Sequence, residues 1–190
     1  MSKSGWVTAA LQPTPSPPGT EGLKSPYLGS FNLLSLRAFL VGKTIIGMQI
    51  DDAIRAVDSL ASRADVDASR ITIYGNGPLG IVALHTAVLD SRIRKVVVEN
   101  TLASYLMVLD QPLHRNISEV MIPGVLRKYD VGGLVLAISP RPVTIINPQD
   151  ANGVVMSEVQ FRKAVGYAFQ SKGQAIRVLE RGPREPLPVE

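Results

Sequence analysis

The stretch of this sequence that decides the fold is Ile71-Thr72-Ile73-Tyr74-Gly75-Asn76-Gly77-Pro78-Leu79-Gly80. It predicts a buried strand, a sharp glycine-rich turn and the start of a helix, because a β-branched run is followed directly by closely spaced glycines. Outward from it, we expect strands at 6–11, 71–74, 95–99, 143–146 and 175–180, and helices at 31–41, about 50–63, 81–90, 131–138 and 157–170.

This alternation of strands and helices predicts an α/β fold, a three-layer sandwich in which helices cover a mostly parallel sheet. Ligands of such sheets bind beyond the carboxyl ends of the strands. The loops that follow residues 11, 74, 99 and 146 are therefore expected to form the functional edge.

Composition excludes several classes of function. The chain has 190 residues, 45% of them hydrophobic, and no cysteine, so disulfides, thiolate nucleophiles and thiolate-bound metals are excluded. Two histidines make a multi-histidine metal site improbable, and we expect neither a metal nor a cofactor. The net charge of +4 is carried by scattered basic residues, which does not indicate a nucleic-acid partner. No signal core and no membrane-spanning run is evident, so the chain as it stands is expected to be cytoplasmic, without a membrane. An additional N-terminal segment would leave the location open.

The turn at residues 75–80 has the layout of a nucleophile elbow, in which a serine follows a strand and opens a helix in the pattern G-x-S-x-G. If Gly75 is the first glycine of that pattern, Gly77 takes the position of the serine and Leu79 departs from the second glycine. Because glycine has no side-chain oxygen, acyl transfer through a serine at this position is excluded.

The same turn also has the glycine spacing G-x-G-x-x-G of a nucleotide or phosphate cradle. Glu99 would be the acidic residue expected about 20 positions further on. Pro78 counts against this alternative, because proline lacks an amide donor. A purely structural tight turn is the third interpretation of the segment.

Four further polar residues are candidates for the same edge. Asp150 lies in the loop after a buried strand, where an acid that orients a histidine would be found, and His114 in the irregular region could act as a base. Asn76 and Ser104 could supply polar contacts. His85, within an apolar helical pattern, is expected to be a core histidine.

Beyond these single residues, an ordered set of motifs resembles bacterial α/β-hydrolases of the acetyl xylan esterase and dienelactone hydrolase type. The resemblance covers most of residues 6 to 180. It divides the chain into an N-terminal strand and Pro-rich loop (1–30), a hydrolase-like domain (31–182) with a cap region at about 100–130, and a frayed tail (183–190). The motifs are Gly29-Ser30-Phe31, Leu36-Arg37-Ala38, Val41-Gly42-Lys43-Thr44, Gly47-Met48, Asp52 before Arg55-Ala56-Val57-Asp58, Val66-Asp67, Arg70-Ile71, Pro112-Leu113-His114-Arg115, Pro123-Gly124-Val125-Leu126, Tyr129-Asp130 and Pro140-Arg141-Pro142.

The resemblance implies carboxylic-ester hydrolysis by an elbow serine, an acid after the penultimate strand and a histidine after the last one, with a small ester or acylated sugar as ligand. Asp150 matches the acid, whereas Gly77 does not match the serine and residues 180–185 contain no histidine. The resemblance also implies that 6–11 is the fourth strand of the family's sheet and that earlier strands are missing. We therefore expect self-association or a partner chain that covers the incomplete sheet.

Three functions stay open at this point. The first is an esterase-like protein without serine-triad activity, either a pseudoenzyme or a fragment. The second is an active hydrolase with a non-standard mechanism through Asp150 and His114, and the third is a nucleotide or phosphate binder at Gly75–Gly80.

Overall fold

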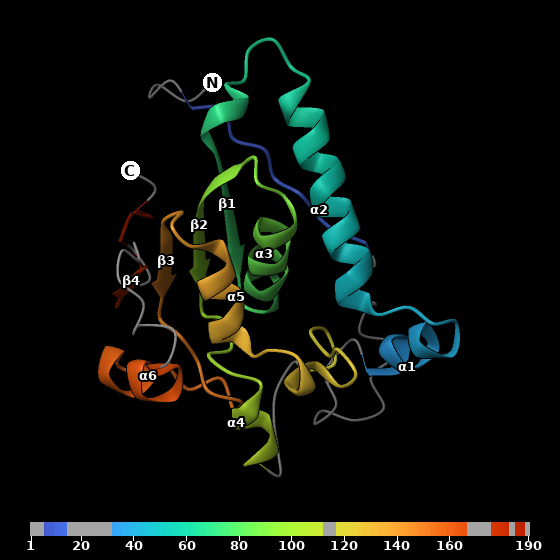
Figure 1. The fold of residues 1–190 in the computed structure, drawn as a ribbon, viewed down its shortest axis with the longest axis vertical. Coiled ribbons are helices and arrows are strands. Elements are labelled where there is room, and N and C mark those ends of the chain that lie inside the picture. Colours follow the sequence, from blue (N-terminus) through green and yellow to red (C-terminus); the bar gives the residue numbers. More distant parts are fainter. Residues whose placement is uncertain (1–5, 15–31, 112–116, 167–175, 183–184, 189–190) are drawn as a thin grey trace.

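The computed structural model of the chain describes residues 6–14, 32–111, 117–166, 176–182 and 185–188. Figure 1 shows the elements in chain order. They are α1 Asn32–Leu40, α2 Ile45–Ala61, β1 Ile71–Asn76, α3 Pro78–Leu89, β2 Ile93–Glu99, α4 Leu106–Leu109, α5 Val131–Ile138, β3 Val143–Ile146, α6 Glu158–Ala164 and β4 Ile176–Leu179, with short 3-10 turns at Ala68–Arg70 and Val125–Arg127.

The four strands form one parallel sheet in the order β1-β2-β3-β4. At its carboxyl edge Asn76 lies beside Glu99, Glu99 beside Ile146, and Ile146 beside Leu179, so all four strands end at one level. The predicted α/β fold is confirmed, and the four predicted strands from 71–74 onward are found at or within a few residues of their expected positions.

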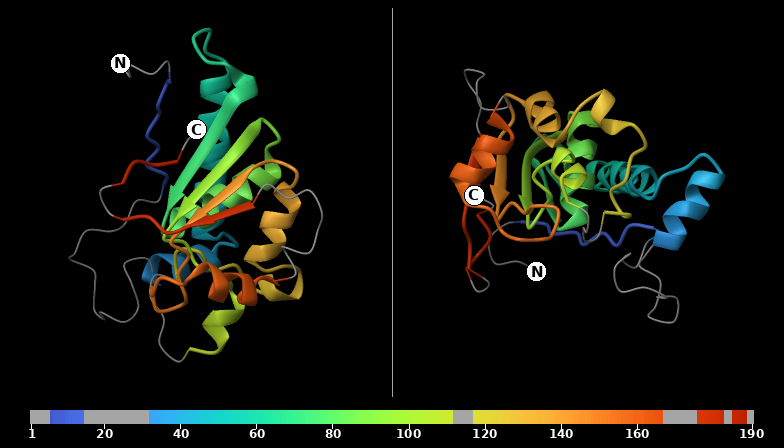
Figure 2. Two further views of the ribbon diagram at one scale, coloured as in Figure 1. Left: turned by 90° about the vertical axis from the view of Figure 1, so that its left-hand side faces the viewer. Right: turned by 90° about the horizontal axis from the view of Figure 1, so that it is seen from below.

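Helix α3 packs on β1 and β2, and helices α2 and α5 pack against α3 (Figures 1 and 2). Helix α3 is apolar all round and buried from Gly80 to Ala87, as expected for a helix enclosed by β1, β2 and two neighbouring helices. Helix α2 instead buries one stripe and begins at Thr44, whose hydroxyl accepts the amide of Gly47 at 3.0 Å.

Helices α1, α4 and α6 lie on the side of the molecule toward which the strands point (Figures 1 and 2). In the described residues 100–111 and 117–129, the chain is largely irregular apart from α4 and the turn Val125–Arg127, which agrees with its irregular sequence. A role as a cap stays a prediction. The helix expected at 157–170 ends earlier, at Ala164, and residues 167–170 lie outside the described part of the chain.

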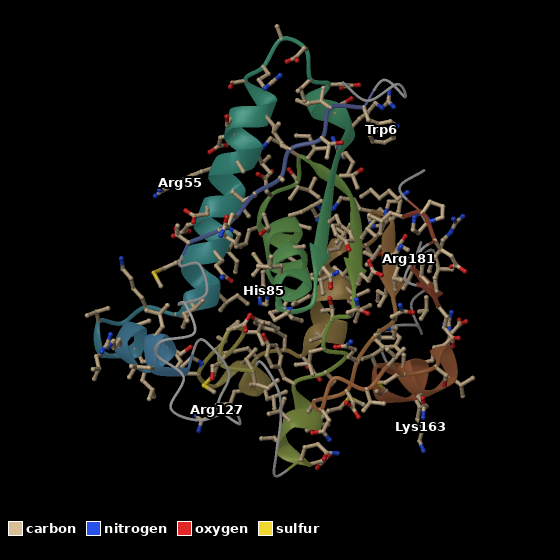
Figure 3. All side chains as sticks on the ribbon, turned by 180° about the vertical axis from the view of Figure 1, so that it is seen from behind. Trp6, Arg55, His85, Arg127, Lys163 and Arg181 are labelled. Carbon is tan, nitrogen blue, oxygen red and sulfur yellow. The ribbon has the colours of Figure 1, made fainter. Side chains whose placement is uncertain are left out.

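The strand predicted at 6–11 is wrong. These residues are exposed and do not join the sheet, although they run alongside β1 and α2 (Figure 3). Instead, the Trp6 ring lies 6.0 Å from the Arg70 guanidinium, and Thr14 donates its amide to Asp52 at 2.8 Å. An apolar run becomes a strand only where a neighbouring strand accepts its hydrogen bonds. β1 is therefore an edge strand of the described sheet.

Among the described residues, no single helix is long and apolar enough to cross a membrane, although α1 and α2, bent by 85° at their junction, together meet the length and composition criteria.

Candidate functional site

The turn between β1 and α3 has the backbone of a nucleophile elbow. Gly77 lies at φ 58° and ψ −131°, a strained region in which residues other than glycine are rare. A Cβ at Gly75 would overlap the Leu79 carbonyl, and a Cβ at Gly80 would overlap the Thr101 hydroxyl. A Cβ at Gly77 would meet nothing within 4 Å. The chain therefore packs strand and helix closely around an elbow whose central position is empty of side chain.

Most backbone amides of this turn are already hydrogen-bonded within the protein or are absent. Gly77 donates its amide to the Glu99 carbonyl at 2.8 Å, and Gly80 donates to the Gly77 carbonyl at 3.0 Å. Pro78 has no amide proton, yet the residue after the nucleophile supplies one donor of the oxyanion hole in α/β-hydrolases. Three of the four residues from Gly77 to Gly80 therefore offer no amide to an anion. This geometry argues against a phosphate cradle as well as against a complete oxyanion hole.

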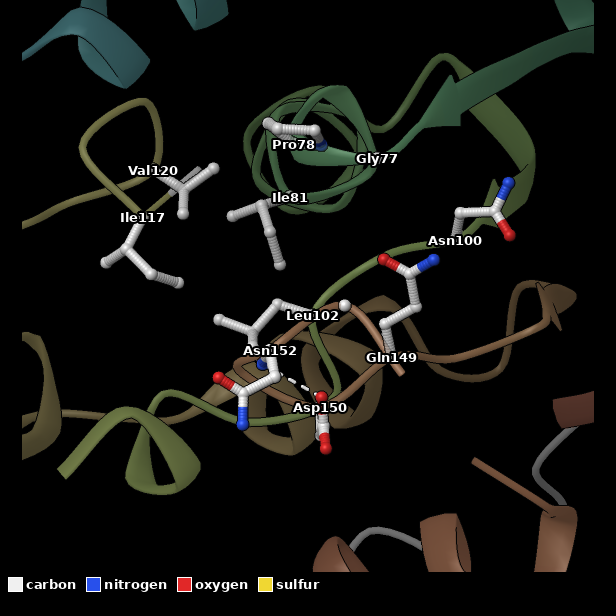
Figure 4. A pocket seen from close by; sticks show the side chains of 11 residues that line it. Gly77, Pro78, Ile81, Asn100, Leu102, Ile117, Val120, Gln149, Asp150 and Asn152 are labelled. Atoms are coloured by element: carbon white, nitrogen blue, oxygen red, sulfur yellow. Dashed lines mark hydrogen bonds between the residues drawn. The ribbon is translucent and has the colours of Figure 1, made fainter. Parts of the chain in front are cut away.

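A cavity of about 270 Å³ opens beside the elbow at the carboxyl edge of the sheet (Figure 4). One part of its wall is aliphatic and the other carries side-chain amides and one carboxylate. The lining residues are Gly77, Pro78, Ile81, Asn100, Leu102, Ile117, Val120, Gln149, Asp150, Asn152 and Gly153.

The structure brings two of the predicted site residues, Gly77 and Asp150, to this cavity. The Asp150 carboxylate accepts the amides of Asn152 at 2.8 Å and Val154 at 2.9 Å through one oxygen, which holds the loop after β3 in a tight turn. Asn76 is exposed outside the lining and accepts a hydrogen bond from Asn100 at 3.3 Å. His114 lies outside the described residues.

Two other candidate residues, Ser104 and His85, are buried and hydrogen-bonded within the protein, away from the cavity lining. Ser104 is buried and its hydroxyl donates to Asp130, which also begins α5. His85 is buried, with Nδ1 2.8 Å from the Ile81 carbonyl and Nε2 2.9 Å from the Tyr129 hydroxyl. Burial lowers the pKa of His85, so the neutral ring donates through Nδ1 and accepts through Nε2. His85 is thus the expected core histidine.

A polar network that the sequence did not reveal closes the carboxyl edge. The Glu99 carboxylate accepts the Tyr74 hydroxyl at 2.7 Å through one oxygen, and through the other it accepts Arg181 Nε at 3.0 Å and Nη2 at 2.5 Å. Arg181 and Asn147 exchange two further hydrogen bonds of 2.8 and 2.9 Å. Burial, followed by the hydrogen bond and charge of Glu99, raises the pKa of Tyr74. Each strand end thus contributes one member to the network.

This network changes the interpretation of two positions. Glu99, the acidic residue that the nucleotide alternative requires, is buried and paired, so it does not fit that alternative. Arg181 follows β4, where the resemblance implies a histidine, and it forms an ion pair with Glu99. The sequence signal was an acid at the end of a buried strand, but its partner lies 82 residues away.

The described residues contain no group of three or more histidine, aspartate or glutamate side chains that could hold a metal ion.

No protein-family model matches this chain. It is 30% identical over 147 residues to “Putative hydrolase YtaP” of Bacillus subtilis (strain 168), an alignment that covers 74% of the chain but 48% of that protein. The chain therefore spans about half the length of the curated relative it matches.

Solved structures share the fold at low identity. A “putative acetyl xylan esterase” from Bacteroides fragilis NCTC 9343 superposes with a TM-score of 0.62 at 15% identity, over 80% of this chain and 40% of that one. An acylaminoacyl peptidase from Pyrococcus horikoshii gives a TM-score of 0.51 at 14% identity, over 71% of this chain and 23% of that one. The resemblance found in the sequence is confirmed at the level of the fold.

Proposed function

We propose that this chain is an α/β-hydrolase-type domain that binds a small ester, such as an acylated sugar, in the cavity beside the elbow without cleaving it by serine chemistry. One observation carries the proposal. Gly77 keeps the strained elbow conformation but has no nucleophilic hydroxyl, and Pro78 has no backbone N–H for the oxyanion. The hydrolase relationship is supported by the relative from B. subtilis and by the shared fold.

The chemistry of the site supports binding in preference to turnover. An acyl transfer needs a nucleophile, a base in hydrogen-bond reach and donors for the developing oxyanion. At the elbow, glycine replaces the nucleophile and proline removes one donor. After β4, Arg181 is engaged with Glu99. The cavity, by contrast, keeps a volume and a mixed lining that suit a small ligand.

The alternative of an active hydrolase through Asp150 and His114 has less support. One Asp150 oxygen already accepts two backbone amides of its own loop, so the carboxylate has a structural task. The nucleotide alternative is weakened further by Asp150, the one charged residue among the described lining residues, because a carboxylate repels phosphate.

The test measures hydrolysis and binding on the same protein. Wild-type protein is assayed with p-nitrophenyl acetate and butyrate, and its binding of ethyl butyrate and an acetylated xyloside is followed by ligand-observed NMR. We expect no cleavage above the buffer rate and saturable binding that Leu102→Trp abolishes by filling the cavity. Leu89→Trp, at a position that is 66% exposed on α3, is the matched control.

Wild-type turnover that disappears in Asp150→Asn would replace this proposal with the active alternative. Circular dichroism of both tryptophan variants shows that loss of binding is not loss of folding. Binding that persists in a folded Leu102→Trp variant would place the ligand elsewhere.

A further inference from the structure

The Gln149 side chain is a neutral polar group of the cavity that the described part of the fold leaves available. In Figure 4 it extends from the loop after β3 toward the space below Gly77. Within the described part of the chain, no hydrogen bond holds its amide group, whereas Asn100 donates to Asn76 and Asn152 donates to Gln111 at 3.1 Å. Gln149 can therefore offer both a donor and an acceptor to a ligand.

The backbone that carries this side chain is fixed on both sides. The backbone N–H of Gln149 donates to the Thr101 carbonyl at 2.9 Å, and the backbone carbonyl of Gln149 accepts the Ala103 N–H at 2.8 Å. Gln149 also bridges to Val155 on the other side of the loop. Because this backbone is already ordered, little of its conformational entropy is lost when the side chain binds a ligand. This favours binding.

The charges around the cavity select the class of ligand. Asp150 is the only ionisable residue of the lining, and no lysine, arginine or histidine is among the lining residues of the described chain. Arg181, at the same edge of the sheet, is paired with Glu99. Among the described lining residues, a carboxylate or phosphate would meet one negative charge and no cation, which costs free energy.

We infer that Gln149 recognises the carbonyl group of the ligand, and that the charge of Asp150 beside it selects a neutral carbonyl compound, an ester or amide, over the corresponding carboxylate. The Gln149 Nε2 group donates to the ligand carbonyl, in place of the amide that Pro78 does not supply. The acyl group packs against the aliphatic wall formed by Ile81, Ile117 and Val120. The inference rests on the proposed binding function and adds to it a discrimination between an ester and the acid that its hydrolysis would release.

The test compares butyramide with butyrate, which share a skeleton and differ in charge, by ligand-observed NMR titration of the wild type. Butyramide cannot report esterase activity, so the result does not depend on catalysis. We expect butyramide to bind about tenfold or more tightly than butyrate, equivalent to about 1.4 kcal/mol. Gln149→Leu and Gln149→Glu are expected to weaken butyramide binding by about tenfold, the effect of one lost hydrogen bond in a partly buried site.

Gln160→Glu is the matched control, because it makes the same change at the third position of α6. There the Gln160 side chain accepts the Ser157 amide at 2.9 Å, and a glutamate would keep this capping bond. The variant is expected to bind both probes like the wild type.

Equal binding of butyramide and butyrate, or unchanged binding in a folded Gln149→Leu variant, would overturn the inference while leaving the binding function intact. Ester turnover by the wild type would overturn the proposed function, yet the order of the two probes and its dependence on Gln149 would still support the role of this residue.

Discussion

Arg181→Met is expected to be among the most destabilising single changes outside the apolar core. It removes the cation that faces Glu99, whose side chain is 4% exposed, while that of Arg181 is 18% exposed. Removing one member of a buried pair leaves an uncompensated charge and typically costs about 3–5 kcal/mol. The cost is a large share of the roughly 5–15 kcal/mol by which a domain is stable. For a chain of this size it lowers the Tm by roughly 6–20 °C.

The assay is urea unfolding followed by circular dichroism, with Tm as a second measure. Arg63→Met is the control, since Arg63 pairs with Asp65 at 2.7 Å but the two side chains are 52% and 60% exposed. Exposed pairs of this kind contribute little to stability, because solvent screens their charges. The double variant Glu99→Gln/Arg181→Met removes both charges and is expected to be more stable than Arg181→Met alone.

A loss in Arg181→Met no larger than that in Arg63→Met would refute the reasoning that burial makes the network essential to the carboxyl edge. A double variant less stable than Arg181→Met would refute the claim that the unpaired Glu99 charge carries the cost.

Three other outcomes test the elbow, the interior and the sheet edge. Gly77→Ser is expected to fold and to lose roughly 1–3 kcal/mol in its free energy of unfolding, because of the backbone strain at φ 58°. It is expected to gain no cleavage of p-nitrophenyl acetate, and adding Pro78→Ala restores an amide but no base. Turnover in either variant would contradict the argument. Burial raises the pKa of Glu119 from 4.5 to about 7, so its contribution to stability is full below pH 4.5 and is lost as the pH rises through about 7. The free energy of unfolding across this range should therefore depend less on pH in Glu119→Gln than in the wild type. An unchanged profile would argue against a buried acid. The edge of β1, which no strand of the described residues pairs with, is expected to associate with a second copy. Thr72→Lys should then reduce the mass measured by light scattering, whereas a wild-type monomer at all concentrations would count against this expectation.

Much of the fold could be predicted because the pattern of apolar residues within single segments indicates the helices and strands. The apolar stripe of α2 and the β-branched runs of β2 and β3 marked these elements, and β3 was expected at the residues where it lies. The strand expected at 6–11 failed because strand formation depends on a neighbour that the local pattern does not encode. α6 ends at Ala164, sooner than expected, because a helical pattern in the sequence does not define where the helix stops.

The candidate site divides in the same way. Asp150 and Gly77 could be placed at one edge, because the carboxyl ends of parallel strands meet there. Gln149 was missed, since a glutamine beside a candidate aspartate has no signal in the sequence. Arg181 and Glu99 were not connected, because they are 82 positions apart in the sequence and only the folded sheet brings them together.

The sequence by itself determined that this chain has an α/β fold and that its elbow lacks a serine, because the identity of a side chain is a local fact. Only the tertiary structure decided that Gly77 keeps the strained backbone of an elbow and that Gly75 and Gly80 allow α3 to approach its neighbours. The structure also decided that Glu99 is a buried anchor and that Gln149 faces the cavity. These features depend on which groups meet across the sheet, and such contacts are set by packing between segments far apart in the chain.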